Sequence, residues 1–273
     1  MSFIIGFKPH DKEDTKNKNI TGKTAVSSKE PKKSLVEVYF KERGCSYTYY
    51  NDKFNLKKGD IVFVDGKLEG VRGVVTDLSY SFKIKLSDYK RVVALADTDV
   101  HGKLYVANEH FLSFDRNVIP YSKVSTWYAP PLNADDEIVC GDDEKVYALT
   151  DDMKSLDTSN SVYFRGVEYF QDGNVSFLEL DGENGRAIVE GNRGYTVEFC
   201  YKNGEVSNLR CDCYCVGVCK HMVCALMQLS ALLKNIEKNY AFKYKDSGYV
   251  SIVRKYILLN ITVMQREDGE ITL

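Results

Sequence analysis

The sequence has no long apolar run and little proline. No stretch approaches the ~20 consecutive apolar residues that a membrane-spanning helix requires. Residues 1–9 also lack the charged start and the small-residue cleavage site of a secretory signal. With only 5 prolines in 273 residues and 44% hydrophobic residues, the composition is that of a folded chain. We therefore expect a cytoplasmic protein that makes no contact with a membrane.

An excess of charge of one sign is also lacking, since the net charge is −2. The distribution is nevertheless uneven. Residues 1–129 hold 22 Lys and Arg against 16 Asp and Glu, residues 130–185 hold 3 against 14, and residues 186–273 hold 12 against 9. The acidic middle would repel phosphate backbones and the two flanks would attract them. Any nucleic-acid surface must therefore be local.

Aromatic residues are plentiful, and 19 Tyr with 13 Phe argue against an all-α fold. A Lys-, Asn- and Ser-rich segment predicts a flexible arm over residues 1–34. Short β-branched or aromatic runs then alternate with glycines, at 36–40, 47–50, 61–64, 71–75, 91–95 and 104–106. Close strands and tight turns predict a small β-barrel domain over residues 35–129.

Part of this region resembles a known barrel type. The string from Lys58 to Gly66 reads Lys-Gly-Asp-Ile-Val-Phe-Val-Asp-Gly, and a second string, Gly-Val-Arg-Gly-Val-Val, begins at Gly70. This turn-and-strand pattern is similar to that of SH3-like barrels of the KOW type. The resemblance covers about 40 residues.

A domain boundary is predicted near residue 130, where two prolines follow Trp127 and Tyr128 and precede an acidic stretch. Residues 130–185 are interpreted as an acidic, β-rich connecting region, and residues 239–273 as a C-terminal extension. Between them, residues 186–238 predict a ββα unit.

The pattern of this ββα unit is clear in the sequence. Residues 195–201 alternate in the manner of a strand, and Asn203-Gly204 is a typical two-residue hairpin turn before a return strand over 206–210. From Lys220 to Lys238, apolar residues recur at helical spacing. The expected fold class is therefore α+β and mostly β: an SH3-like barrel, a β-rich region and a C-terminal ββα unit.

Cysteine is concentrated in the same unit, since five of the 8 cysteines lie between Cys211 and Cys224. In a reducing compartment, clustered thiols indicate metal binding rather than disulfides. Cys211 and Cys213 are two apart at a strand end, so their side chains point to one side. Cys219 and His221 can share an ion only if Cys219 lies at or before the start of the helix, because positions two apart inside a helix diverge.

The spacing C-x-C, five residues, then C-x-H resembles the SWIM zinc-finger family, with a match from about Arg186 to Leu233. The resemblance implies that Zn²⁺ is the cofactor and that the ligands are Cys211, Cys213, Cys219 and His221. It also implies binding to DNA or protein as an accessory to a larger assembly. Cys215 could replace Cys211, and Cys224 lies one helical turn after His221, so both remain alternative ligands.

Other candidate sites are weaker. His101 and His110 match no metal or acid–base motif and are interpreted as loop residues. Trp127 and Tyr128 could stack on a base, but we expect them to anchor a loop. The acidic residues between Asp135 and Glu144 lack a calcium-loop spacing.

The isolated Cys45 and Cys140 lack the neighbours of a catalytic thiol. We therefore expect no enzyme and no small-molecule substrate. The leading hypothesis is a recognition module that contacts nucleic acid, with DNA favoured, through a basic flank of Arg186, Arg193, Lys202, Arg210 and Lys220. The alternative is a zinc-stabilised adaptor between proteins.

Overall fold

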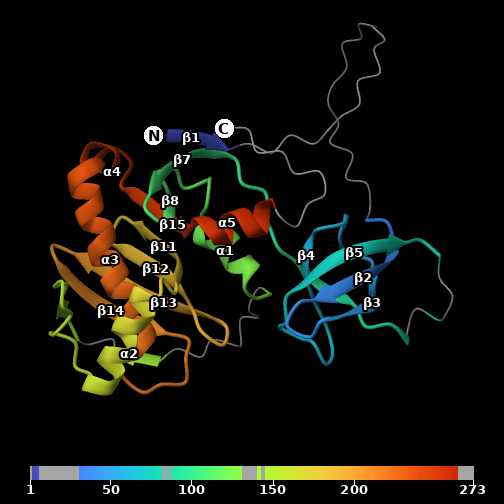
Figure 1. Cartoon of the computed structure of the whole chain (residues 1–273), viewed down its shortest axis with the longest axis horizontal. Coiled ribbons are helices and arrows are strands. Elements are labelled where there is room, and N and C mark those ends of the chain that lie inside the picture. The colour runs from blue at the N-terminus through green and yellow to red at the C-terminus, as the bar shows by residue number, and fades with distance from the viewer. Residues whose placement is uncertain are drawn as a thin grey trace, which may run out of the picture.

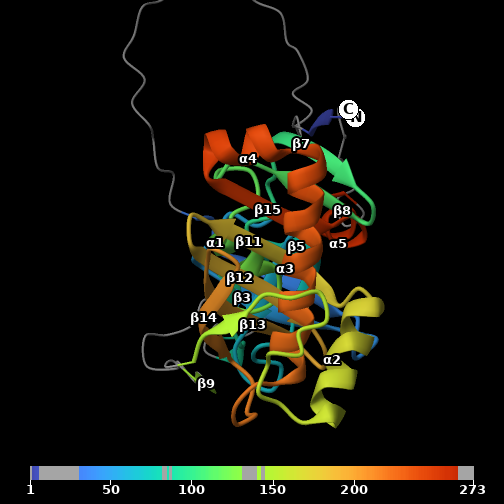
Figure 2. The same cartoon turned by 90° about the vertical axis from the view of Figure 1, so that its left-hand side faces the viewer.

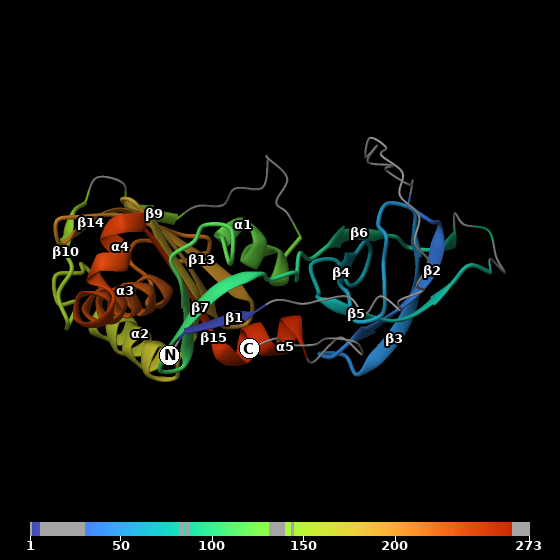
Figure 3. The ribbon, with the colours of Figure 1, turned by 90° about the horizontal axis from the view of Figure 1, so that it is seen from above.

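The computed structural model shows two antiparallel β-sheets and the helices that cover the larger one (Figure 1). It describes residues 2–5, 31–81, 85, 88–130, 140–142 and 145–263. The five-stranded sheet lies at one end of the molecule, and α2, α3 and α4 lie at the other (Figure 3). This arrangement confirms the expected fold class, α+β with more strand than helix.

The five-stranded sheet contains the predicted N-terminal strands. Its order is β3 (Cys45–Asn51), β2 (Ser34–Phe40), β5 (Gly73–Ser79), β4 (Ile61–Val64) and β6 (Val92–Leu95). Alternation in β2 places Val36, Val38 and Phe40 in the core on one face.

The expected barrel is not closed. Within the part of the chain that the structure describes, no ladder joins the edge strands β3 and β6. They meet at one parallel bridge, Tyr50 with Arg91, where the Tyr50 N–H donates to the Lys90 carbonyl at 2.8 Å.

In the described part of the chain, the larger sheet has ten strands, all antiparallel. Their order is β1 (Ser2–Ile5), β7 (Gly102–Ala107), β8 (His110–Ser113), β15 (Tyr249–Arg254), β11 (Val175–Asp181), β12 (Asn184–Glu190), β13 (Gly194–Lys202), β14 (Glu205–Cys211) and β10 (Tyr147–Ala148), while β9 (Cys140–Asp142) also pairs with β14. Helix α3 lies across strands β11, β12 and β13 of this sheet (Figure 2).

This sheet does not follow the predicted division into segments. Strand β1 comes from the expected arm, β7 and β8 from the expected barrel domain, and β15 from the expected C-terminal extension. β15 lies between β8 and β11 in the middle of the sheet. Long-range pairing therefore joins segments that composition separates, and the larger sheet takes strands from both sides of the boundary predicted near residue 130.

Helices cover both faces of the larger sheet. The helices are α1 (Tyr121–Val124), α2 (Asn160–Gln171), α3 (Lys220–Asn239), α4 (Ala241–Ser247) and α5 (Lys255–Thr262), and a short 3₁₀ helix, η2 (Ser125–Trp127), follows α1. Along strand β11, Leu178 faces the cluster that contains α3, whereas its neighbour Phe177 faces the cluster that contains α5. The predicted helix at 220–238 is confirmed as α3.

Helix α2 lies in the segment that we expected to be a β-rich connection. It packs against α3 at Gly166, where an added Cβ would come within 2.5 Å of Val223. Ser159 caps its N-terminus by accepting the Val162 N–H. The helix therefore needs a residue without a side chain at its contact with α3.

Trp127 links the two sheets, as the expected loop anchor. Its side chain is fully buried, and its indole N–H donates to the Asp97 carbonyl at 2.6 Å. The Arg72 guanidinium donates to the Trp127 carbonyl at 3.2 Å, and Ile61 of the five-stranded sheet packs in the same cluster.

In the described ranges, no helix has both the length and the apolar character needed to cross a membrane.

Candidate metal centre

The predicted hairpin delivers the first two candidate ligands. Asn203 and Gly204 have φ of 51° and 85°, the left-handed values that a two-residue turn requires. The return strand β14 ends at Cys211, whose partner across the ladder is Val197. Because residues directly opposite each other share a face, Cys211 points with Val197 toward α3.

The third ligand lies where the spacing argument requires it. Cys219 is the N-cap of α3, with φ −105° and ψ 168°. Its sulfur accepts the Met222 N–H, and its own N–H donates to the Met222 sulfur at 3.4 Å. The chain turns back before it at Gly217, which has φ 71°. Cys219 and His221 can therefore face the same point.

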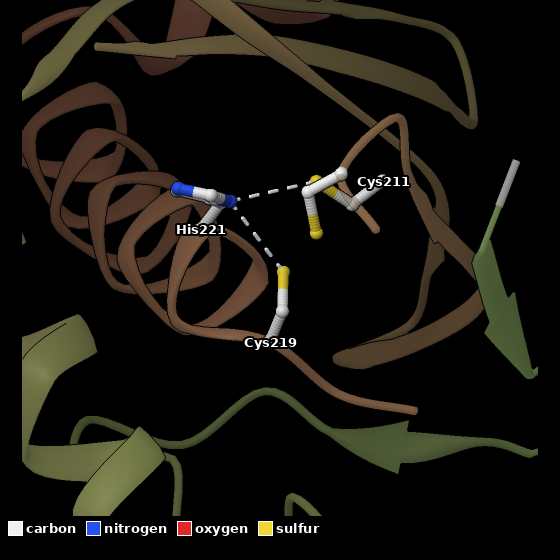
Figure 4. A group of neighbouring side chains, drawn as sticks. Cys211, Cys219 and His221 are labelled. Atoms are coloured by element: carbon white, nitrogen blue, oxygen red, sulfur yellow. Dashed lines mark hydrogen bonds between the residues drawn. The ribbon is translucent and has the colours of Figure 1, made fainter. Parts of the chain in front are cut away.

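The four predicted ligands come together in a buried cluster. Their ligand atoms all lie within 4.8 Å of one another, and Cys211, Cys213, Cys219 and His221 are only 1%, 3%, 2% and 4% exposed. The His221 Nδ1 atom lies 3.8 Å from both the Cys211 and the Cys219 sulfur, and Figure 4 shows it turned toward them. A tetrahedral ion with bonds of about 2.3 Å to sulfur and 2.0 Å to nitrogen needs ligand separations of about 3.5–3.8 Å.

The electrostatics of the cluster favour a cation. Burial raises the pKa of the Cys213 thiol to about 12. The hydrogen bond between Cys211 and Cys219 raises the pKa of Cys211 and lowers that of Cys219, which His221 also lowers. Without an ion, at most one of the three sulfurs is a stable thiolate in this site. A divalent cation offsets the free-energy cost of ionising the other two thiols. Thiolate is the form of cysteine that binds metal.

Aromatic rings fix the orientation of His221. Its ring stacks on Tyr195 with 4.0 Å between centroids and 16° between planes, and the Tyr169 ring lies 5.8 Å away. The Nε2 atom is buried and has no hydrogen-bond partner among the described residues. The ring is therefore held by packing, with Nδ1 as its ligand atom, and the four residues could hold a metal ion.

The two alternative ligands lie outside this cluster. Cys215 is exposed. Cys224 is fully buried in the core beneath α3, and burial raises its pKa to about 12. The candidate site therefore consists of the four clustered residues and includes neither Cys215 nor Cys224.

Most of the predicted basic flank is neutralised within the chain. Arg186 pairs with Glu198 at 3.1 Å, and Lys202 pairs with Glu183 at 2.7 Å. Arg193 pairs with Asp212 at 3.1 Å. Lys220 instead donates to the Tyr169 hydroxyl at 2.6 Å.

The remaining candidates do not assemble into a site. His101 is exposed, His110 lies on β8, and neither belongs to a metal-binding group in the part of the chain that is described. The side chains of the acidic stretch between Asp135 and Glu144 lie outside the described residues.

Tyr169, on α2, is a site residue that the sequence analysis missed. The available signal was helical spacing of Val162, Gly166 and Phe170 after the capping Ser159. This signal covers only a short stretch, and it lies in a segment that we interpreted as an acidic, β-rich connecting region.

No protein-family model, curated protein or solved structure matches the chain. The resemblance to the SWIM family therefore remains a prediction from the spacing of its residues.

Proposed function

We propose that the chain is a zinc-binding recognition module of the SWIM type, without catalytic activity, that contacts nucleic acid within a larger assembly. The observation that carries the proposal is the buried cluster of three cysteines and one histidine. Sulfur and imidazole together are a typical donor set for zinc, and four protein ligands leave no open position for water or substrate. The metal would then act by holding β14 and the loop after it against the start of α3.

The loop between the ligands supports a recognition role. Cys213 and Cys219 hold its two ends, and between them Tyr214 and Val216 are 84% and 99% exposed. These exposed side chains do not contribute to a hydrophobic core, so they are available to contact a partner. Because both ends of the loop are held, little conformational entropy is lost when the loop binds.

The same two exposed side chains also favour the second candidate, an adaptor between proteins. The ion pairs of Arg186, Arg193 and Lys202 reduce the free positive charge that phosphate would meet. Nucleic acid remains our proposal because a pocket beside this loop carries cationic and no acidic side chains.

Two measurements test the proposal. Elemental analysis of the purified chain should give one equivalent of zinc, and no zinc or two equivalents would refute the assignment. A mobility-shift titration with single- and double-stranded DNA and RNA at low salt should then detect a complex that weakens as salt increases. No complex with any probe, or weak binding that salt does not affect, would count against nucleic acid and leave the protein adaptor as the candidate.

A further inference from the structure

A pocket lies directly beside the metal cluster. Its volume is about 350 Å³, and α2, the turn before β13, and the loop from Cys213 to Cys219 form its walls. Its side chains include Arg165, Tyr169, Tyr195 and Lys220, and no Asp or Glu lines it. Pockets of about 300–1,000 Å³ are of the size that takes small ligands or single residues of a polymer.

Among the described residues, neither cation of this pocket forms an ion pair with an acidic side chain. Arg165 donates through Nε to the Ser161 carbonyl at 3.2 Å, and the Lys220 Nζ lies 4.1 Å above the Tyr169 ring while it donates to the hydroxyl. Neither forms an ion pair with any described residue, in contrast to Arg193 on the turn before β13, which pairs with Asp212. The two cations together carry more positive charge than the net charge of −1 that three thiolates and a divalent ion would carry. The pocket therefore attracts an anion.

A platform for a ring borders the same pocket. Tyr214 lines it and is 84% exposed, on the loop whose ends the cluster holds. An exposed ring beside two cations combines the features that bind a base and its phosphate in single strands. A duplex keeps its bases stacked inside, where one tyrosine at the mouth of a pocket does not reach them.

We propose that this pocket binds one nucleotide of a single-stranded nucleic acid, with the phosphate at Arg165 and Lys220 and the base stacked on Tyr214. This inference rests on the nucleic-acid part of the proposed function and names the form of the ligand and its place of contact. It also accounts for the absence of an ion pair at Lys220 and Arg165 among the described residues, where Arg186, Arg193 and Lys202 each form one.

Fluorescence anisotropy of the full-length, zinc-loaded chain tests the proposal. Labelled short oligothymidine, oligouridine and a DNA duplex serve as probes over a range of salt concentrations. Tyr214→Ala should weaken single-strand binding about tenfold, and Tyr214→Phe should preserve it. Arg165→Gln and Lys220→Gln should each reduce the salt slope by about 0.7. Every variant must retain one equivalent of zinc.

Two matched controls remove the same kinds of group elsewhere. Lys154→Gln removes one charge from an ion-paired, exposed lysine outside the predicted basic flank, and Phe242→Ala removes a ring that is 82% exposed on α4. Neither should change single-strand affinity. If Tyr214→Ala and Phe242→Ala gave equal affinities and the salt slopes did not change, the pocket would not be the site, although nucleic-acid binding would stand.

Other outcomes separate this inference from the function on which it rests. Equal binding of duplex and single strand, lost together in the variants, would refute the single-strand proposal. Failure of the zinc-loaded wild-type chain to bind any probe would refute both. Binding of an acidic peptide that Arg165→Gln abolishes would then identify a protein as the occupant.

Discussion

Removal of the metal should loosen the loop around the cluster without unfolding the sheet. A hairpin with one helix has a small core, so a free-standing ββα unit would unfold as a whole when a chelator removed its metal. In the structure, α3 instead packs on a sheet that includes β15 and β8. The ββα unit has no separate core of its own.

The magnitudes support this expectation. The α3 side chains that are at most 4% exposed include six large apolar ones: Met222, Val223, Leu226, Leu229, Leu232 and Ile236. At about 1.5–3 kcal/mol each, their burial contributes roughly 9–18 kcal/mol before the entropy of ordering is subtracted. Structural zinc binding contributes about 10–16 kcal/mol in zinc-finger peptides, which have no such sheet. Packing of α3 is therefore comparable to the contribution of the metal.

The protonation states point in the same direction. When the ion leaves, Cys213 can take up a proton, because burial raises its pKa to about 12. A neutral thiol costs little in a core, so the residues beneath α3 need not separate. The loop from Asp212 to Val218 is packed less tightly, since Tyr214, Cys215 and Val216 are exposed and only Cys213 and Val218 reach the core.

Hydrogen exchange with and without a chelator measures the difference. Amides of residues 212–221 should lose protection, whereas those of β11, β12 and the second half of α3 should keep it. Cys45→Ser, far from the cluster in sequence and outside it, is the control and should give the same pattern as the wild type. If β11–β14 and all of α3 lost protection together, the metal rather than the shared core would hold this face of the sheet.

Further expectations concern single residues. His221→Ala should release zinc while Cys45→Ser retains it, as elemental analysis would show; retention by the first would exclude the imidazole as a ligand. Cys215, the exposed thiol beside the cluster, should react first with a thiol reagent in the zinc-loaded chain, and mass spectrometry would contradict this if a clustered cysteine reacted sooner. Burial raises the pKa of Glu179, so its protonated form favours the fold and this stabilisation is lost as pH rises through the folded pKa. Glu179→Gln should therefore gain thermal stability relative to the wild type as pH rises from acid to neutral, and a shrinking difference would refute the reasoning. Gly166→Ala should lower stability by about 1–3 kcal/mol in denaturant titrations despite the better helix propensity of alanine, because the methyl group would lie 2.5 Å from α3; an unchanged midpoint would show that the helices can separate without cost.

The sequence by itself determined the local features of the candidate site. The hairpin at Asn203-Gly204, the strand end at Cys211 and the helix that begins after Cys219 all follow from short-range rules: turn residues with positive φ, alternation in a strand, and the divergence of positions two apart in a helix. Those rules act within about 30 residues, and the four ligands span only 11 positions. For this reason the cluster could be predicted before the fold was known.

The tertiary structure alone decided how the segments assemble. Nothing local in β15 indicates that it lies between β8 and β11, because its pairing partners are distant in sequence and its residues are buried on both faces. Composition at the acidic segment predicted a boundary, yet burial of apolar surface joined the strands on either side of it. The contact between Gly166 and Val223, which places Tyr169 beside His221, likewise depends on two helices meeting across 57 positions of sequence. Such packing depends on shape in three dimensions, which hydrophobic periodicity along one chain does not encode.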